Sequence, residues 1–332
     1  MRICRRGISP ARALVSLLVM AVALAACGAS APSTGASITP LPGPPCGNDT
    51  SPTVADTVGT VATRIYEEEA AGGPDKQQVE RYGPLLSALA AGNRTAVRTA
   101  VTHLVFSGTH IVRLRIIQGG EVLADVGGPY VLAPVRGVLR LNGRTVGEYV
   151  LSVQDDLGYV KLETRFIGLP LVLMRGSERI PLPGTIAASD IPERGDVSYH
   201  GAEYRVVSVK GEAFPAGALR MSVLVPVPPP SSTHSCPAVR VLEMGRLVKQ
   251  IWRRFRLLGA SAASFVKSTP GLTGAQIYVR RGSHQLAGSN LPGPAHILDE
   301  GSVIYEGVTY GVTSFPGRAT SGRVRVYVLL AQ

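Results

Sequence analysis

The residues that could do chemistry in this sequence are few, and the densest group of them lies around an acidic pair, Asp155-Asp156. Carboxylates placed in this way can receive an amine or a cation at the mouth of a pocket, and nearby tyrosines can line a small-molecule cleft. Two alternatives stay open: Asp-Asp-Leu-Gly suits a turn whose Asp side chains cap backbone groups, and strand tyrosines commonly pack on the sheet. The ligand-binding candidates are Tyr130, Tyr149, Ser152, Asp155, Asp156 and Tyr159.

The usual catalytic and metal-binding motifs are missing from the sequence. It has no Gly-x-Ser-x-Gly, no His-Glu-x-x-His and no phosphate-binding Gly-x-x-x-x-Gly-Lys string. The six histidines are scattered without the spacing of metal ligands. We therefore expect no enzymatic activity, no cofactor and no metal site.

The N-terminus predicts an export signal with a lipid anchor. Arginines precede a short apolar run, and Leu-Ala-Ala-Cys-Gly then places Cys27 where a bacterial lipoprotein is cleaved and acylated. An ordinary secretory signal with a chance cysteine is the alternative. We assign residues 1–26 to the signal peptide and 27–52 to a flexible tether rich in Gly, Ala, Ser, Thr and Pro.

Cys46 and Cys236 are the two cysteines that remain after the signal and the acylated residue are set aside. Both lie in Pro-rich stretches, and export makes a disulfide between them plausible chemistry. Two unpaired thiols are the alternative. We predict the bridge, because it would fix two linkers to each other.

The charge of the chain suits an anionic cell-envelope surface. The formal net charge is +11, of which the signal's four arginines account for part. This excess is spread along the chain, and together with export it excludes a nucleic acid as the expected partner.

The mature chain changes from a helical to a β pattern near residue 108. Residues 53–107 are predicted to be helical, with breaks at Gly72-Gly73-Pro74 and Gly83-Pro84 and an N-cap at Asn93. From there on, short alternating strands are separated by Gly turns, and the last strand of the first set is expected over "YVKLETRF".

The β pattern is repeated along the chain. The modules at 169–226 and at the end of 238–332 align without a gap between Arg175 and Ser208 at an offset of 106 positions, so that Tyr204 falls on Tyr310. A more distant copy occupies about 108–168. A Pro/Ser linker at 227–237 precedes a long expected helix with a basic face, which either contacts an anionic surface or is simply solvated.

This arrangement resembles the extracytoplasmic Cache (PAS-like) sensor domain family. The resemblance is closest in "HIVRLRIIQGGEVLADVGGPYVLAPVRGVLRLNGRTVGEYVLSVQDDLGYVKL", and it covers residues 53–226, with a third module in 238–332. It implies an α+β fold, in which a helical segment precedes repeated modules with antiparallel five-stranded sheets. It also implies a small molecule bound between a sheet and the loop joining its second and third strands, here in the first module.

The expected function is that of a sensory or small-molecule-binding protein, anchored by lipid on the extracytoplasmic face of the bacterial cell membrane. The sequence shows no second membrane span and no output domain, so a signal would pass through a membrane receptor or transporter partner. The alternative is a structural or protein-interaction envelope lipoprotein with degenerate PAS-like modules.

Overall fold

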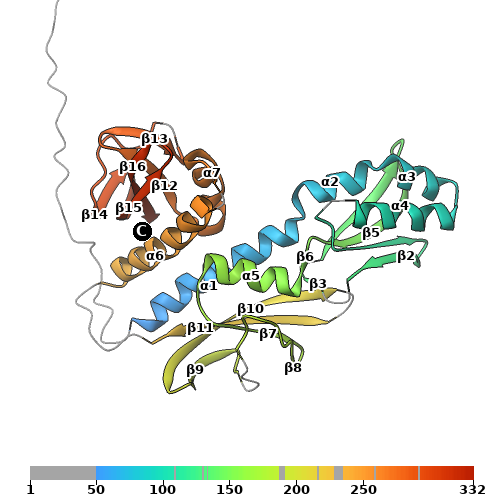
Figure 1. Ribbon diagram of the computed structural model, residues 1–332, viewed down its shortest axis with the longest axis horizontal. Coiled ribbons are helices and arrows are strands. Elements are labelled where there is room, and N and C mark those ends of the chain that lie inside the picture. The colour runs from blue at the N-terminus through green and yellow to red at the C-terminus, as the bar shows by residue number, and fades with distance from the viewer. Residues whose placement is uncertain are drawn as a thin grey trace, which may run out of the picture. The chain divides into compact units, whose positions relative to one another are not determined.

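The N-terminal helical region consists of four helices in a computed structural model of the chain (Figure 1). The structure describes residues 50–107, 110–128, 131–132, 134–186, 191–214, 217–227, 235–257, 259–290 and 292–332. The helices are α1 (Ser51–Ala71), α2 (Gly73–Arg81), α3 (Gly83–Ala90) and α4 (Arg94–Phe106). Gly72 ends α1 at a φ of 68°, and Asn93 caps α4 by accepting from the amide of Ala96 at 3.0 Å, as predicted.

The first sheet packs on these helices and has four antiparallel strands in the order β2-β1-β5-β4. Its strands are β1 (Arg113–Gln118), β2 (Glu121–Gly127), β4 (Val135–Leu141) and β5 (Arg144–Ser152). Buried side chains of α3 and α4, among them Leu85 and Leu104, form one core with Leu114, Ile116 and Leu139 of the sheet. The sheet thus has one strand fewer than the five expected.

The missing strand is a helix, so the expectation for "YVKLETRF" was wrong. Helix α5 (Asp156–Phe166) covers that segment, and Asp155 caps it by accepting from the amide of Gly158. Tyr159, Val160 and Glu163 are buried on one face, the i, i+1, i+4 spacing of a helix. Over only eight residues the hydrophobic pattern is compatible with a strand as well as with a helix. The Asp155 side chain favours the helix, because it caps the first turn.

The second sheet is antiparallel and seven-stranded. Its strands are β3 (Val131–Leu132), β6 (Gln154–Asp155), β7 (Leu171–Arg175), β8 (Glu178–Arg179), β9 (Arg194–Tyr199), β10 (Ala202–Phe214) and β11 (Ala218–Pro226). The hairpin between β9 and β10 turns at His200 and Gly201, which both have positive φ as a tight primed turn requires.

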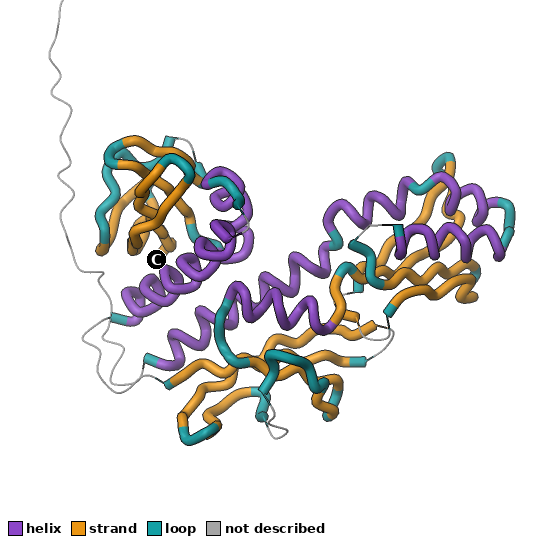
Figure 2. Tube along the Cα trace, in the orientation of Figure 1, coloured by secondary structure: helices purple, strands orange, loops and turns teal. Residues whose placement is uncertain are grey.

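The third sheet has the five antiparallel strands that were expected, in the order β13-β12-β16-β15-β14. They are β12 (Gln276–Arg281), β13 (His284–Gly288), β14 (Glu300–Tyr305), β15 (Val308–Ala319) and β16 (Gly322–Ala331). The long helix expected before them is two helices, α6 (Cys236–Leu257) and α7 (Ala262–Thr273), because Gly259 takes a φ of 72° and Ser261 caps α7. Figure 2 shows both helices in purple beside these orange strands.

The internal repeat extends further than the strand pattern alone indicated. Tyr159 and Phe265, at the same place in α5 and α7, are 106 positions apart, whereas Tyr66 and Trp252, at the same place in α1 and α6, are 186 apart. The first copy of the unit therefore carries 80 additional residues between its two helices. We call α1, α5 and β7–β11 the central copy, α6, α7 and β12–β16 the C-terminal copy, and residues 72–155 the inserted segment.

Matched glycines confirm this alignment. A Cβ on Gly59 of α1 would lie 2.7 Å from Val207, and one on Gly245 of α6 would lie 2.5 Å from Thr313. Each glycine lets a strand approach the long helix of its copy closely, and both residue pairs keep the two offsets of 186 and 106 positions. None of the helices in the described part of the chain is long and apolar enough to cross a membrane.

Candidate functional site

The polar residues of the C-terminal copy gather on one face of its sheet. Alternate residues of β12 face the helices, where Ile277 and Val279 are buried in the large core. Gln276, Tyr278 and Arg280 occupy the opposite face. The cross-strand register adds Tyr327 of β16, directly opposite Tyr278. We call Gln276, Tyr278, Arg280, Gln285, Tyr310 and Tyr327 the tyrosine–arginine cluster.

Arg280 is buried without a carboxylate partner. Its side chain donates from Nη1 to the carbonyl of Ala295 at 3.1 Å and from Nη2 to the carbonyl of Pro294 and to Gln285 Oε1 at 3.4 Å. The residue is only 9% exposed, and its Nε has no hydrogen-bond partner among the described atoms. Arg280 takes part in no ion pair of the described residues. Its positive charge is therefore buried and is contacted by carbonyl and amide dipoles instead of a carboxylate.

Two tyrosines of the cluster form a hydrogen-bonded chain through Gln276. The Tyr278 hydroxyl donates to Gln276 Oε1 at 2.8 Å, and Gln276 Nε2 donates to the Tyr310 hydroxyl at 2.9 Å. Burial raises the pKa of Tyr278 to about 12, and the neighbouring Tyr305 and Tyr310 add to the shift while Arg280 opposes it. The Tyr278 hydroxyl therefore stays neutral at ordinary pH, and a neutral tyrosine hydroxyl can serve as both donor and acceptor.

The segment between β13 and β14 covers the cluster. Gly288 and Gly293 lie against the Tyr278 ring, and a Cβ on either would come within 2.7 and 2.3 Å of its carbons. Tyr305 holds the same segment by donating to the carbonyl of Pro292 at 2.6 Å. The cluster therefore lies between a sheet and the loop joining its second and third strands, the place that the resemblance implied, but in the C-terminal copy.

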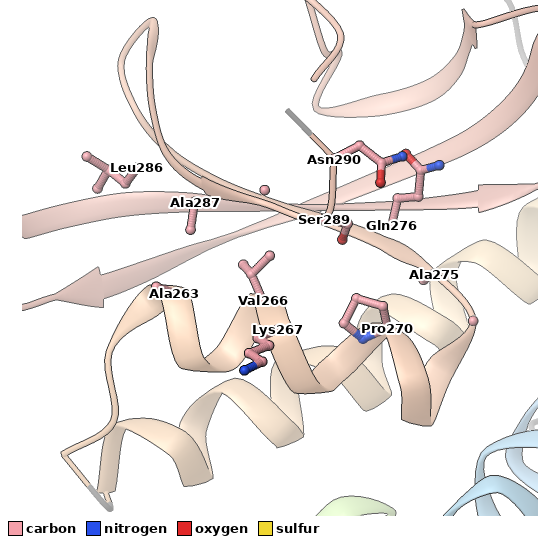
Figure 3. A pocket seen from close by; sticks show the side chains of 12 residues that line it. Ala263, Val266, Lys267, Pro270, Ala275, Gln276, Leu286, Ala287, Ser289 and Asn290 are labelled. Atoms are coloured by element: carbon pink, nitrogen blue, oxygen red, sulfur yellow. The ribbon is translucent and has the colours of Figure 1, made fainter. Parts of the chain in front are cut away.

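An open cleft of about 640 Å³ adjoins this end of the sheet. Figure 3 shows Val266, Lys267 and Pro270 on the α7 side of it and Gln276 and Ser289 on the strand side. Gln276 thus belongs both to the cleft and to the tyrosine–arginine cluster.

A small side chain helps to keep this cleft open. The central copy has Leu169 where the C-terminal copy has Ala275. In the central copy this leucine packs against the large core.

Five of the six candidates from the sequence are described by the structure, and they line none of the clefts described in this section or below. Tyr149 is buried in the first core and donates to Glu80 Oε1 at 2.9 Å, and burial raises its pKa. Buried Ser152 donates to the carbonyls of Leu132 and Gln154. Tyr130 lies outside the described residues, and the ligand roles of the set stay predictions.

The other three candidates belong to α5 and its cap. Asp155 caps the helix, and Asp156 is buried with one oxygen unpartnered in the described structure. Burial and the charge of Asp155 raise the pKa of Asp156 to about 6, against the opposing effect of Arg175. The structure brings Tyr159 together with Tyr66, whose rings meet edge to face with centroids 6.4 Å apart. It does not bring these residues to Tyr149.

Cys236 is disulfide-bonded in the structure. Cys46, its expected partner, and Cys27, the expected lipidation site, lie outside the described residues. The described residues hold no cluster of His, Cys, Asp and Glu suited to a metal ion.

Sequence reasoning missed the tyrosine–arginine cluster, although the repeat contained a usable signal. Where the central copy has Val172, Met174 and Ser222, the C-terminal copy has Tyr278, Arg280 and Tyr327. Three polar or aromatic replacements on one face of a duplicated sheet indicate that this face has a different role in the C-terminal copy. Only the alignment of the two copies makes them visible.

Comparisons with known proteins give structural likenesses only. No family model matches the chain, and no curated protein matches it. Among solved structures, the ligand-binding domain of the Pseudomonas fluorescens chemoreceptor CtaA in complex with L-alanine is 11% identical at a TM-score of 0.26, over 53% of this chain and 93% of that one.

Two further solved structures are similar over more of the chain. The periplasmic domain of Vibrio cholerae LuxQ is 8% identical, with a TM-score of 0.15, over 85% of this chain and 98% of that one. The ligand-binding domain of Mlp24 with asparagine is 10% identical, with a TM-score of 0.16, over 84% and 95%. At these TM-scores the function has to be argued from the site itself.

Proposed function

We propose that this chain binds a small molecule carrying a carboxylate, in the tyrosine–arginine cluster of its C-terminal copy. The observation that carries the proposal is the buried Arg280 guanidinium, whose Nε is unpartnered and which has no carboxylate beside it in the described structure. A planar anion is the group that a guanidinium fork fits, because two parallel N–H groups can donate to its two oxygens.

The energetics of burial support this assignment. Removing a charge from water costs several kcal/mol per ion, and carbonyl dipoles offset only part of that cost. A ligand carboxylate would replace the contacts with Pro294 and Ala295 by a charge-assisted pair. The hydroxyls of Tyr278, Tyr310 and Tyr327 would then contact the polar remainder of the ligand, since such groups set orientation in small-molecule sites.

We place this binding protein outside the cytoplasmic membrane, held there by lipid at Cys27 and acting through a membrane partner. The apolar run and the Leu-Ala-Ala-Cys-Gly string support the anchor. Cys27→Ala should release the full chain from the membrane fraction, and continued retention of that variant would count against lipidation.

Exchanging residues between the copies tests the ligand site. The full mature chain is first screened by thermal shift against amino acids, organic acids and purines, and the best compound is titrated by calorimetry. Arg280→Met, which installs the central copy's residue, should weaken binding of a carboxylate by roughly 30-fold or more, the usual effect of removing one partner of a buried charge pair. Tyr278→Val should weaken it further in the same background.

Arg281→Met is the matched control, because Arg281 is exposed and donates only to the carbonyl of Ser321. It should leave binding unchanged within about twofold. The proposal fails if Arg280→Met binds as tightly as the parent, or if no compound of the screen shifts the melting temperature and none co-purifies.

A structural role is the second candidate, and it rests on the central copy. There the face beneath the corresponding loop is filled by Val172, Met174, Ile191, Val206 and Leu224, which form an apolar cluster of their own. A face packed in this way holds the loop, and two polar residues on it are engaged with the protein itself: Ser222 bonds to Ser208 and Arg220 donates to the carbonyl of Ile191.

A further inference from the structure

A second cleft of the C-terminal copy, between α6 and β15, is lined by four basic residues. Its volume is about 680 Å³, and it is lined by Lys249, Trp252, Arg253, Arg256, Leu257, Phe315, Pro316, Gly317 and Arg318. No acidic residue is among them. Leu257, at the end of α6, is 76% exposed. We call this cleft the basic groove.

The cations of the basic groove lack the acidic partner that Arg246 of the same helix has. Arg246 is paired with Glu243 through contacts of 2.6 to 2.9 Å, whereas Lys249, Arg253 and Arg256 take part in no ion pair of the described residues. Arg318 joins them from β15, a different element. A solvated face of α6 would explain neither the additional cation on β15 nor the cleft between α6 and β15.

The same place in the central copy is covered by the inserted segment. Arg136 of that segment pairs with Glu212, the counterpart of Arg318. Strand β3 pairs with β10 at Ala213 and Phe214, and Arg113 lies over the Phe214 ring with its guanidinium carbon 4.9 Å from the centroid. One copy therefore uses this surface to dock a folded piece of polypeptide.

The charges of this surface are reversed between the copies. Arg253 and Arg318 of the C-terminal copy stand where the central copy has Glu67 and Glu212. In the central copy the acidic surface receives an arginine. The C-terminal copy lacks the insertion, so its groove is open, and its positive charge calls for the opposite sign in whatever docks there.

We propose that the basic groove docks an acidic segment of a partner protein, with carboxylates on Arg253 and Arg318 and an apolar side chain against Trp252 and Leu257. The concave shape favours a polypeptide over a flat bilayer, and the docking seen in the central copy gives the precedent. This surface is separate from the tyrosine–arginine cluster, so each proposal can fail alone.

A peptide titration tests the groove. Residues 28–332 include the whole compact unit Ala36–Gln332 and serve as the binding protein. The probe is a fluorescein-labelled peptide of six glutamates and two leucines, with a glutamine version beside it, measured by fluorescence anisotropy at two salt concentrations. We expect the glutamate peptide to bind at least tenfold more tightly, and less tightly as the salt concentration rises.

Charge reversal to the residues of the central copy gives the decisive variant. Arg253→Glu with Arg318→Glu should weaken the glutamate peptide at least tenfold, while Arg246→Ala should change it less than twofold. All three positions are exposed, and circular dichroism with thermal unfolding verifies the fold of each variant. Equal binding of the glutamate peptide by the reversed variant overturns the proposal. The same variants are titrated with anionic phosphatidylglycerol vesicles. If charge reversal weakens binding to the vesicles alone, the groove contacts a membrane surface and the proposal is overturned.

Discussion

The central and C-terminal copies share one scaffold but differ in the polar groups that they bury on each face of the sheet. On the helix side, the central copy buries Tyr159 and Glu163 where the C-terminal copy has Phe265 and Thr269. On the loop side the order is reversed, with an apolar cluster in the central copy and the tyrosine–arginine cluster in the other. After duplication, the two copies have come to bury different polar and ionisable groups on each face.

The helix side of the central copy is strained electrostatically. Neither oxygen of Glu163 has a hydrogen-bond partner in the described structure, and the same holds for the Tyr159 hydroxyl. Burial raises the pKa of Glu163 to about 8; Tyr159 lies near enough to oppose that shift, and Glu69 of α1 adds to it. The C-terminal copy satisfies the same position, because Thr269 donates to the carbonyl of Phe265 at 2.7 Å.

The largest expected effect that separates the copies is a pH dependence of stability from Glu163. Its folded pKa of about 8 lies above its ordinary value of 4.5, so the folded state holds a proton that the unfolded state has lost. The contribution of Glu163 to stability is therefore fully present below pH 4.5 and is lost as the pH rises to 8, by on the order of 5 kcal/mol in total. Urea unfolding between pH 5 and 9 measures it.

Glu163→Thr, which copies the C-terminal residue, should remove most of that slope. Asp156→Asn is the control, since the raised pKa of Asp156 contributes only up to about pH 6. A slope that persists between pH 6 and 8 in Glu163→Thr would contradict the assignment.

The next effect tests whether the two long helices are equivalent. Gly59→Ala and Gly245→Ala should each destabilise the chain by roughly 1–3 kcal/mol, because the new methyl group meets Val207 or Thr313. The higher helix propensity of Ala returns about 1 kcal/mol. Thermal unfolding measures both variants.

The matched relief variants are Val207→Ala and Thr313→Ser, which remove the contacted methyl groups. Each should restore stability only in combination with the glycine change of its own copy. If Val207→Ala restored the stability of Gly245→Ala, or Thr313→Ser that of Gly59→Ala, the result would be evidence against the alignment of α1 with α6.

The smallest effect concerns single hydroxyl groups of the central copy. Tyr159→Phe should stabilise the chain by about 1 kcal/mol, because it removes a buried hydroxyl that has no partner in the described structure. Tyr66→Phe should cost about the same amount, because the Tyr66 hydroxyl accepts from the amide of Glu212 at 2.8 Å. Urea unfolding measures both variants. If both changed the free energy of unfolding in the same direction, the two hydroxyls would not differ in hydrogen bonding as described.

The tight turns, caps and strand alternation could be predicted from local residue types, since each depends on a few neighbouring positions. Asn142-Gly143, His200-Gly201 and the cap at Asn93 occur where the residue types required them. Helix α5 could not be predicted in the same way, because its short amphipathic pattern fits both periods and its burial depends on α1 and α6.

The sequence by itself determined that the chain has an α+β fold, that a sheet unit is duplicated, and where its glycine turns lie. Tertiary structure alone decided that α1 belongs with α5 across the inserted segment, because that pairing depends on contacts between residues some 90 positions apart, such as Tyr66 and Tyr159. It also decided which polar residues are buried. Arg280 and Glu163 are ordinary charged residues in the sequence, and only packing from distant elements removes their water and leaves Arg280 Nε and both Glu163 oxygens without hydrogen-bond partners in the described structure.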